Sequence, residues 1–386
     1  MPCCKCPKVD TRDMAISSLA AIIERLYHQY VSEQDQALLD LVFKRAPVQA
    51  DVDACLQKAD IEVLGGNKSL LLSYLLHEHP ELRLGSYAEP RVRGLMRYYH
   101  FQNTRTLSHF ARIGKALNRA GIPFVLFKGG AIKALRPELS RPMGDTDILL
   151  PPGTIREAVR LCEGLGYQHI HGKPTHAVGM HTDKEDAVDL HYLLFDEGRD
   201  MAALQAGIFE RAKAHKAFGV DFLLPCHEDL FFLVLTNFTK NLHDHTTLGG
   251  LYYALCDCRY LLDACPSLEF ALVRENAHLG DKEMEVRFAA DFMNRVIPGI
   301  IPEPERNLPY ADKVDDFCNL LVFDENFYMP LRHECQAMRV AELRNYPCLH
   351  GRKIVKFLFM DKMRRFPGFV RWYLQRQKTK GGKHAF

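Results

Sequence analysis

The sequence predicts an α+β protein in which a small mixed β-sheet lies between two helical regions. Residues 11–120 carry apolar positions at helical spacing, as in MAISSLAAIIERLY and SLLLSYLLHEH. Residues 121–195 instead hold short apolar runs separated by glycines, prolines and polar turns, which is typical of strands. Residues 196–386 return to helical patterns. We therefore expect a helical N-terminal region over residues 1–120, an α/β core over 121–195 and a helical C-terminal domain over 196–386.

Glycines and prolines predict where the helical regions are interrupted. In the N-terminal region we expect breaks at Gly65-Gly66 and around Pro90. In the C-terminal region we expect breaks near Pro225, near Pro266 and at the proline-rich segment NRVIPGIIPEPERNLP.

The predicted core opens with a strand that leads into a helix through two glycines. Residues 124–127 form an apolar run between a proline and the glycines, so we expect a buried strand there and a helix over residues 131–135. Between them, Gly129 and Gly130 lack Cβ atoms, so backbone N–H groups can approach an anion closely, with the helix dipole behind them. The simpler alternatives are a tight turn for the glycines and a solvated surface charge for Lys128.

A second strand, over residues 143–150 (MGDTDILL), carries two carboxylates near its start. Side chains alternate across a strand, so Asp145 and Asp147 should project from the same face. Two carboxylates so close repel each other unless a cation lies between them, and a hard divalent ion with oxygen ligands is the usual partner. An acidic pair that only caps a turn is the alternative interpretation.

A third carboxylate is available on a later strand. A connecting helix is expected after Thr154, which has capping-box spacing to Glu157. Three strands should follow, the last two as a hairpin, over residues 167–170, 176–180 and 188–194. Asp189 and His191 share a face of the last strand, so Asp189 can complete a three-carboxylate cluster. We expect His191 to be a structural residue, with a role in orienting Asp189 as the alternative.

The segments KGGAIKAL, RPMGDTDILL and VDLHY together resemble the nucleotidyltransferase superfamily of the DNA polymerase β type. More narrowly, they are similar to a bacterial family of uncharacterised nucleotidyltransferases, whose members share a K-G-x-A segment, an R-P-x-G-D-x-D-x-L segment and a downstream D-x-H. The resemblance extends from residue 121 to about residue 194. It implies a metal-dependent enzyme that transfers a nucleoside monophosphate from a nucleoside triphosphate (NTP) to a hydroxyl-type acceptor and releases pyrophosphate.

The resemblance also implies roles for individual residues. Asp145 and Asp147 match the metal-binding pair, and Asp189 matches the third acid, which binds metal and helps to activate the attacking group. Gly129 and Gly130 match the turn that touches the triphosphate, and as cationic side chains Lys128 and Arg141 are candidates to assist in binding the phosphates. The implied cofactor is Mg²⁺ or Mn²⁺, with two ions about 3.5–4 Å apart acting on the entering and leaving oxygens. The chain departs from the superfamily in lacking a serine after Gly129 and in a longer spacer from Gly130 to Asp145.

Two other functions fit the same residues. In a glycosyltransferase, Asp145-Thr146-Asp147 would hold a metal ion on a sugar nucleotide, but that class needs a longer α/β region before the acidic pair than this chain offers. A nucleotide-sensing or interaction protein would keep the pocket without turnover, and the three intact carboxylates argue against such a loss. The acceptor stays open between a small molecule, a peptide or protein side chain, and an RNA end.

Composition sets weaker bounds. The formal net charge of +2 gives no overall signal for a polyanion partner. The twelve cysteines are irregularly spaced, so reduced thiols are expected, and Cys3, Cys4 and Cys6 lack a second ligand pair at zinc-finger spacing. No apolar run approaches the roughly 18 residues of a membrane span, and the first residues lack the apolar stretch of a secretion signal. We therefore expect a cytoplasmic protein.

The C-terminal segment over residues 352–383 is strongly basic and rich in aromatic side chains. Such a segment can contact RNA, an anionic membrane surface or an acidic partner. A last helix packed through its aromatic side chains, with a frayed basic tail, is the slightly favoured interpretation.

Overall fold

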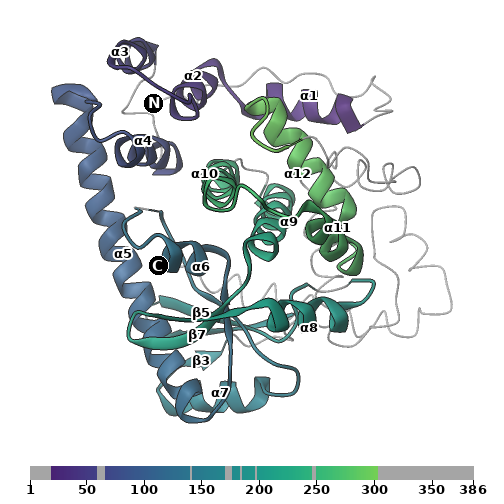
Figure 1. The fold of residues 1–386 in the computed structure, drawn as a ribbon. Helices are drawn as coiled ribbons and strands as arrows, with labels where there is room; N and C mark the ends of the chain where they lie inside the picture. Colours follow the sequence, from purple (N-terminus) through teal and green to yellow (C-terminus); the bar gives the residue numbers. More distant parts are fainter. Residues whose placement is uncertain are drawn as a thin grey trace, which may run out of the picture.

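The computed structural model describes residues 19–58, 66–139, 141–169, 176–182, 185–195, 198–245 and 249–302. This part of the chain forms twelve helices and one seven-stranded mixed sheet, which confirms the predicted α+β fold. In Figure 1 most helices are stacked on one side of the sheet, and α7 lies on the other side. The predictions for Cys3, Cys4, Cys6 and the basic segment 352–383 lie outside the described residues.

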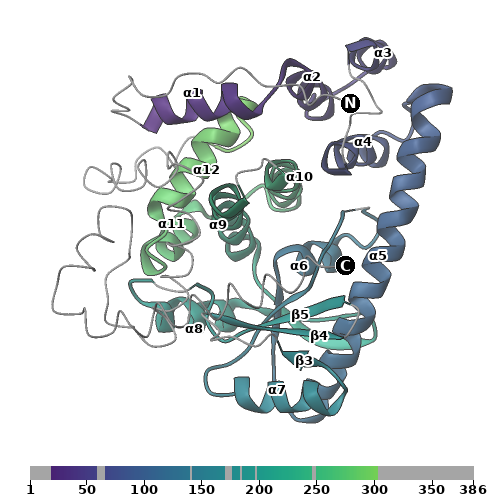
Figure 2. The same cartoon turned by 180° about the vertical axis from the view of Figure 1, so that it is seen from behind.

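The N-terminal part of the chain is helical, as predicted. Its helices are α1 (Leu19–Tyr30), α2 (Glu33–Val42), α3 (Gln49–Lys58), α4 (Gly66–Glu78) and α5 (Gly85–Arg119). Helix α5 runs along the molecule from the region of α4 to the sheet, as both Figure 1 and Figure 2 show. Its buried face, which includes Phe110, Ile113 and Leu117, packs on the sheet.

The break expected around Pro90 is wrong, because Pro90 lies inside α5. A proline in the second turn removes one backbone hydrogen bond. The 35-residue helix continues through Pro90, and Ala88 and Val92 on either side of it are buried.

The strands of the sheet lie in the order β3-β4-β5-β2-β1-β7-β6. Their bounds are β1 Val125–Phe127, β2 Asp147–Leu149, β3 Gln168–His169, β4 Ala177–Thr182, β5 Glu185–His191, β6 Lys213–Ala217 and β7 Val220–Leu224. Strand β2 is central, antiparallel to β1 and parallel to β5. It is shorter than the predicted strand over residues 143–150, and Asp145 precedes it. The predicted hairpin is confirmed, since β4 and β5 pair in antiparallel fashion.

The hairpin of β6 and β7 was not predicted, because the sequence analysis expected helix after residue 195. β7 pairs with β1 in parallel orientation, so the sheet extends beyond the predicted core. Phe218 and Gly219 both have positive φ angles, of 56° and 72°, and form the tight turn of this hairpin. The division of the chain at residues 120 and 195 stays a prediction.

The remaining helices lie around the sheet. They are α6 (Lys128–Leu135), α7 (Ile155–Gly164), α8 (Met201–Arg211), α9 (His227–His245), α10 (Gly249–Ala264), α11 (Phe270–Leu279) and α12 (Glu283–Val296). The breaks near Pro225 and Pro266 are confirmed, since α9 begins and α10 ends within two residues of them. The capping box at Thr154 is not formed, because the Thr154 hydroxyl donates to the Pro151 carbonyl at 2.8 Å. Within the described residues, none of the helices combines the length and the hydropathy needed to cross a membrane.

Candidate active site

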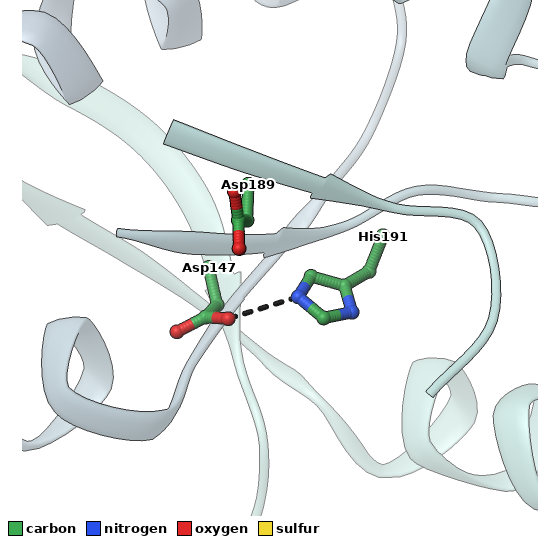
Figure 3. Close-up of side chains that lie close together, drawn as sticks. All are labelled: Asp147, Asp189 and His191. Carbon is green, nitrogen blue, oxygen red and sulfur yellow. Dashed lines mark hydrogen bonds and ion pairs between the residues drawn. The ribbon is translucent and has the colours of Figure 1, made fainter. Parts of the chain in front are cut away.

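The pairing of β2 with β5 brings two of the predicted acids together. Asp147 lies opposite Asp189 in the parallel register of these strands, so the two residues are neighbours on adjacent strands. Figure 3 shows both carboxylates beside the ring of His191. One carboxylate oxygen from each acid and one ring nitrogen of His191 lie within 4.8 Å of one another. Asp145, two residues before Asp147, lines the same cleft.

The charges of this carboxylate cluster (Asp145, Asp147 and Asp189) are poorly balanced. Burial would raise the pKa of Asp147, but the ammonium group of Lys128 and a hydrogen bond from His191 outweigh it and lower the pKa. At the other two acids the attraction of Lys128 is outweighed by burial and by the neighbouring carboxylates. Although Asp145 reaches solvent, the surrounding protein and the charges of Asp147 and Asp189 raise its pKa to about 7. Burial and the charge of Asp147 also raise the pKa of Asp189.

This electrostatic deficit fits a divalent cation. The donor set consists of carboxylate oxygens, which are the ligands that Mg²⁺ and Mn²⁺ prefer. Groups with raised pKa values favour a nearby positive charge, because it stabilises their ionised form. The residues present therefore match the cofactor that the sequence implied.

His191 contacts Asp147 rather than Asp189. Its Nε2 lies 2.8 Å from Asp147 Oδ1, and its side chain is only 1% exposed. Burial, together with the charge of Lys128, lowers the pKa of His191 to about 3, so the ring is neutral and Nε2 donates to the carboxylate. The alternative in which His191 orients Asp189 is therefore wrong. Among the described residues, the buried Nδ1 of His191 has no hydrogen-bond partner. The expectation that His191 is a structural residue with satisfied hydrogen bonds is therefore met only for Nε2.

The position of Lys128 follows from the pairing of β1 with β2. Phe127, at the end of β1, lies opposite Asp147, so the next residue comes alongside this carboxylate. Lys128 is the first residue of α6 and has a positive φ angle of 51°, which is uncommon for a residue other than glycine. Its Nζ donates a hydrogen bond to Asp147 Oδ1.

The two glycines lie within the first turn of α6, where the sequence analysis expected a turn before the helix. A Cβ atom on Gly130 would come within 2.6 Å of Leu126 Cδ1, so this glycine allows α6 to pack closely on β1. A Cβ atom on Gly129 would collide with the guanidinium group of Arg141. Of the two, Gly129 lines the cleft.

Arg141 is held by a buried partner from the helical part of the chain. Its Nε and Nη2 donate to the carboxylate of Asp257 on α10 at 2.9 to 3.1 Å, a bidentate ion pair. The Arg141 side chain is 13% exposed and that of Asp257 is 4% exposed. The buried amide of Asn103 on α5 also holds this segment, donating to the Arg141 carbonyl at 2.6 Å and accepting from Met143 N at 3.0 Å. The loop before Asp145 is thus fixed from two sides.

A cleft of about 990 Å³ connects these groups. It is bounded by the carboxylate cluster and the first turn of α6 on the sheet side, and by α5, α9 and α10 on the helical side. In Figure 1, α5 runs past α6 to the sheet, and α9 and α10 lie on the same side of the sheet as α6.

The chain matches a known protein family over most of the region that the structure describes. Residues 69–297 match the family described as "Uncharacterised nucleotidyltransferase". The chain belongs to this family. The resemblance inferred from the sequence is therefore confirmed, and the matched region includes the whole sheet and the cleft.

Solved structures give weaker similarities to this nucleotidyltransferase. A solution structure of the antibiotic-resistance factor ANT(2″)-Ia is 19% identical, with a TM-score of 0.31, and covers 45% of this chain and 89% of its own. A crystal structure of ANT(2″)-Ia with adenylyl-2″-tobramycin is 20% identical, with a TM-score of 0.27, and covers 49% of this chain and 97% of its own. No curated protein matches the chain.

Several cleft residues of the nucleotidyltransferase escaped the sequence analysis. They are Tyr98, Tyr99 and Arg105 on α5, Asn237 and Lys240 on α9, and Tyr253 and Asp257 on α10. Only Asp257 has a local signal in the sequence, since it is an acid within the largely apolar helical run LYYALCDCRYLL. The others look like ordinary surface residues of helices until the fold brings the helices together.

Proposed function

We propose that the protein is a metal-dependent nucleotidyltransferase that moves a nucleoside monophosphate from an NTP to a hydroxyl-type acceptor. The observation that carries this proposal is the convergence of Asp145, Asp147 and Asp189 in one cleft with a deficit of positive charge. Membership of the nucleotidyltransferase family supports the reaction class.

The three carboxylates would hold Mg²⁺ or Mn²⁺. When bound, two such ions would neutralise charge on the transferring phosphoryl group and on the departing pyrophosphate. His191 keeps one oxygen of Asp147 in a fixed direction through its hydrogen bond.

Asp189 is the proposed proton acceptor. The acceptor oxygen forms a bond to the α-phosphorus, and the bond from this phosphorus to the bridging oxygen breaks, releasing pyrophosphate. The hydroxyl proton passes to the Asp189 carboxylate and then to water. The raised pKa of Asp189 suits this role, since a base works best when its pKa lies nearer the operating pH.

The phosphates would lie over the first turn of α6. Lys128 and Gly129 line the cleft there, and an ammonium group is a well-established partner for phosphate. Gly130 would act through its backbone N–H group. Arg141 stays a candidate through Nη1, because its other nitrogens bind Asp257 and Nη1 has only a 3.4 Å contact to the Pro142 carbonyl.

The helical side of the cleft would receive the base or the acceptor. Tyr98, Tyr99 and Tyr253 line it, and aromatic rings of this kind stack on nucleobases and other flat groups. The acceptor can be a small molecule, a peptide or protein side chain, or an RNA end, and a cytoplasmic location remains our expectation.

The test is a transfer assay on the full chain with α-labelled NTPs, Mg²⁺ or Mn²⁺, and cell extract as the source of acceptor. We expect label to enter a product with wild-type protein and not with Asp145→Asn or Asp147→Asn. Asp221→Asn is the matched control, because Asp221 lies on β7 of the same sheet, has a 70% exposed side chain and does not line the cleft. Undiminished transfer in both cluster variants would refute the proposal.

A thermal-shift screen separates the remaining classes. We expect NTPs with metal to stabilise the protein more than sugar nucleotides do. Stabilisation by sugar nucleotides alone would indicate a glycosyltransferase. Stabilisation by NTPs without any transfer would indicate a nucleotide-sensing protein.

A further inference from the structure

At the carboxylate cluster, the ammonium group of Lys128 lies beside the oxygens that would bind a metal ion. Lys128 Nζ and His191 Nε2 both donate to the same oxygen, Asp147 Oδ1. Lys128 brings a positive charge to this oxygen through a direct ion pair. The second oxygen of Asp147 and the carboxylate of Asp189 are left to bind a metal ion.

We propose that Lys128 and a divalent metal ion compete for this cluster, and that an NTP ends the competition by drawing the Lys128 ammonium onto its phosphates. This inference rests on the proposed function and deepens it, since it states how metal and nucleotide are loaded. Metal alone binds weakly, and metal and nucleotide bind with positive coupling.

The backbone directs Lys128 to the cluster. The register that places Phe127 opposite Asp147 puts the next residue beside the carboxylate, and the positive φ angle of Lys128 starts α6 at that point. Its Nζ lies 5.2 Å from the centre of the Phe127 ring, so the side chain lies back over β1. The contact is therefore built into the junction between β1 and α6.

Competition follows from the shared carboxylate. A metal ion bound by Asp147 and Asp189 would lie next to an ammonium group that already donates to Asp147. The Asp147 side chain is only 8% exposed, and like charges repel strongly where little water screens them. Bound together, the two cations would each weaken the binding of the other.

The Lys128 side chain can move from Asp147 to a phosphate in the cleft. Its side chain is 22% exposed and lines the cleft beside Gly129. A lysine ammonium is a compact charge on a flexible stem, which suits a move of a few ångströms from a carboxylate to a phosphate. The nucleotide would thus supply the negative charge that Lys128 gives up at Asp147.

Such an exchange makes the coupling reciprocal. If an NTP raises the affinity for metal, metal raises the affinity for the NTP by the same factor. Removing the ammonium group should therefore increase the affinity for metal alone and reduce the coupling.

The experiment is a Mn²⁺ titration of the metal-free full chain, followed by electron paramagnetic resonance of free Mn²⁺. It is run alone and with an ATP analogue that has a methylene bridge between the α- and β-phosphorus, corrected for Mn²⁺ that the analogue binds in solution. For wild-type protein we expect the analogue to tighten Mn²⁺ binding by ~10-fold, a usual size for coupling between two sites. Lys128→Met should bind Mn²⁺ alone ~10-fold more tightly than wild type, with little further gain from the analogue.

Three further variants make the result specific. Lys128→Gln repeats the charge removal with a polar side chain, in case the methionine variant folds poorly. Lys128→Arg keeps the charge and should resemble wild type. Lys115→Met removes one charge from an exposed position on α5, outside the cleft, and should also resemble wild type.

Equal or weaker Mn²⁺ binding by Lys128→Met and Lys128→Gln in the absence of nucleotide overturns the inference. This comparison needs no nucleotide, so it is decided even if the chain binds no NTP. Failure of wild-type protein to bind the analogue at all would instead contradict the proposed function.

Discussion

Two charge centres line the same cleft and differ in how far their charges are balanced. At the first, Lys128 supplies one ammonium group to a cluster of three carboxylates, two of which have raised pKa values. At the second, the guanidinium group of Arg141 meets the single carboxylate of Asp257 in a bidentate pair, and the pKa of Asp257 is raised by burial and not by another carboxylate. Asp147 of the first centre and Asp257 of the second are both buried, so the burial of one carboxylate does not distinguish the centres.

The difference shows which centre can do chemistry. In the Arg141–Asp257 pair each charge is matched, so the pair gains little from a ligand and serves to fix the loop before Asp145. The carboxylate cluster has more negative charge than its neighbours neutralise, so it gains from any cation that enters. Negative charge that neighbouring groups do not neutralise is therefore a better sign of a reactive centre than buried charges alone.

The largest expected effect is on transfer by Asp147→Asn. The amide keeps the shape of the side chain but removes the charge that would bind metal. We expect kcat to fall by ~10³-fold or more, the scale seen when a group that stabilises transition-state charge is lost. The measurement is steady-state transfer, with circular dichroism to check the fold. If Asp257→Asn lowered kcat equally in fully folded protein, the distinction between the two centres would collapse.

The second-largest expected effect is a lower free energy of unfolding in the variant Asp257→Leu. This change leaves the Arg141 guanidinium buried without its partner, which costs about 3–5 kcal/mol of unfolding free energy for a buried pair. Urea denaturation measures it. The double variant Arg141→Met/Asp257→Leu removes both charges and should recover most of the loss. A single variant as stable as wild type would mean that the pair does not hold the loop.

The sequence could predict the cluster because each of its parts is encoded locally. The apolar run before Lys128, the Asp145-x-Asp147 pattern and the alternation that places Asp189 on a strand face are all visible within a few residues. The parallel pairing of Asp147 with Asp189 then follows once β2 and β5 are neighbours.

The second centre could not be predicted, because its contacts join distant residues. Arg141 and Asp257 are 116 positions apart, and Asn103 reaches the Arg141 carbonyl from 38 positions away. The hairpin of β6 and β7 was missed for a different reason. β6 (Lys213–Ala217) is a mostly exposed edge strand with lysines and a histidine, so it shows no run of alternating apolar residues.

A smaller effect is expected for Asn103→Leu, which tests the other support of the same loop. The change leaves the Arg141 carbonyl and the Met143 N–H group without their side-chain partners in a buried site. We expect a loss of about 1–3 kcal/mol in unfolding free energy. Transfer should fall less than in Asp147→Asn. The loss should appear in kcat, because Asn103 positions the metal-binding loop and touches no substrate. Asn103→Asp keeps the oxygen that accepts from Met143 N, so its transfer rate should lie between those of Asn103→Leu and wild type. Full activity in Asn103→Leu would show that the Arg141–Asp257 pair suffices alone.

The smallest effect concerns pH, and it tests whether the cluster lacks positive charge in the metal-free protein. The pKa of Asp145 is about 7 in the folded chain, above the value of about 3.9 in the unfolded chain. Between these values the folded state holds the proton more tightly, so this residue makes the protein less stable as pH rises from about 4 to about 7. Asp145→Asn removes the contribution, and solvent access at Asp145 keeps it modest. We expect the difference in melting temperature, variant minus wild type, to grow over this range and to level off above it. Mg²⁺ should shrink the difference, since a bound cation favours the ionised carboxylate. A difference that does not change with pH would mean that neighbouring groups already neutralise Asp145, and the contrast between the two centres would then be smaller than their geometry indicates.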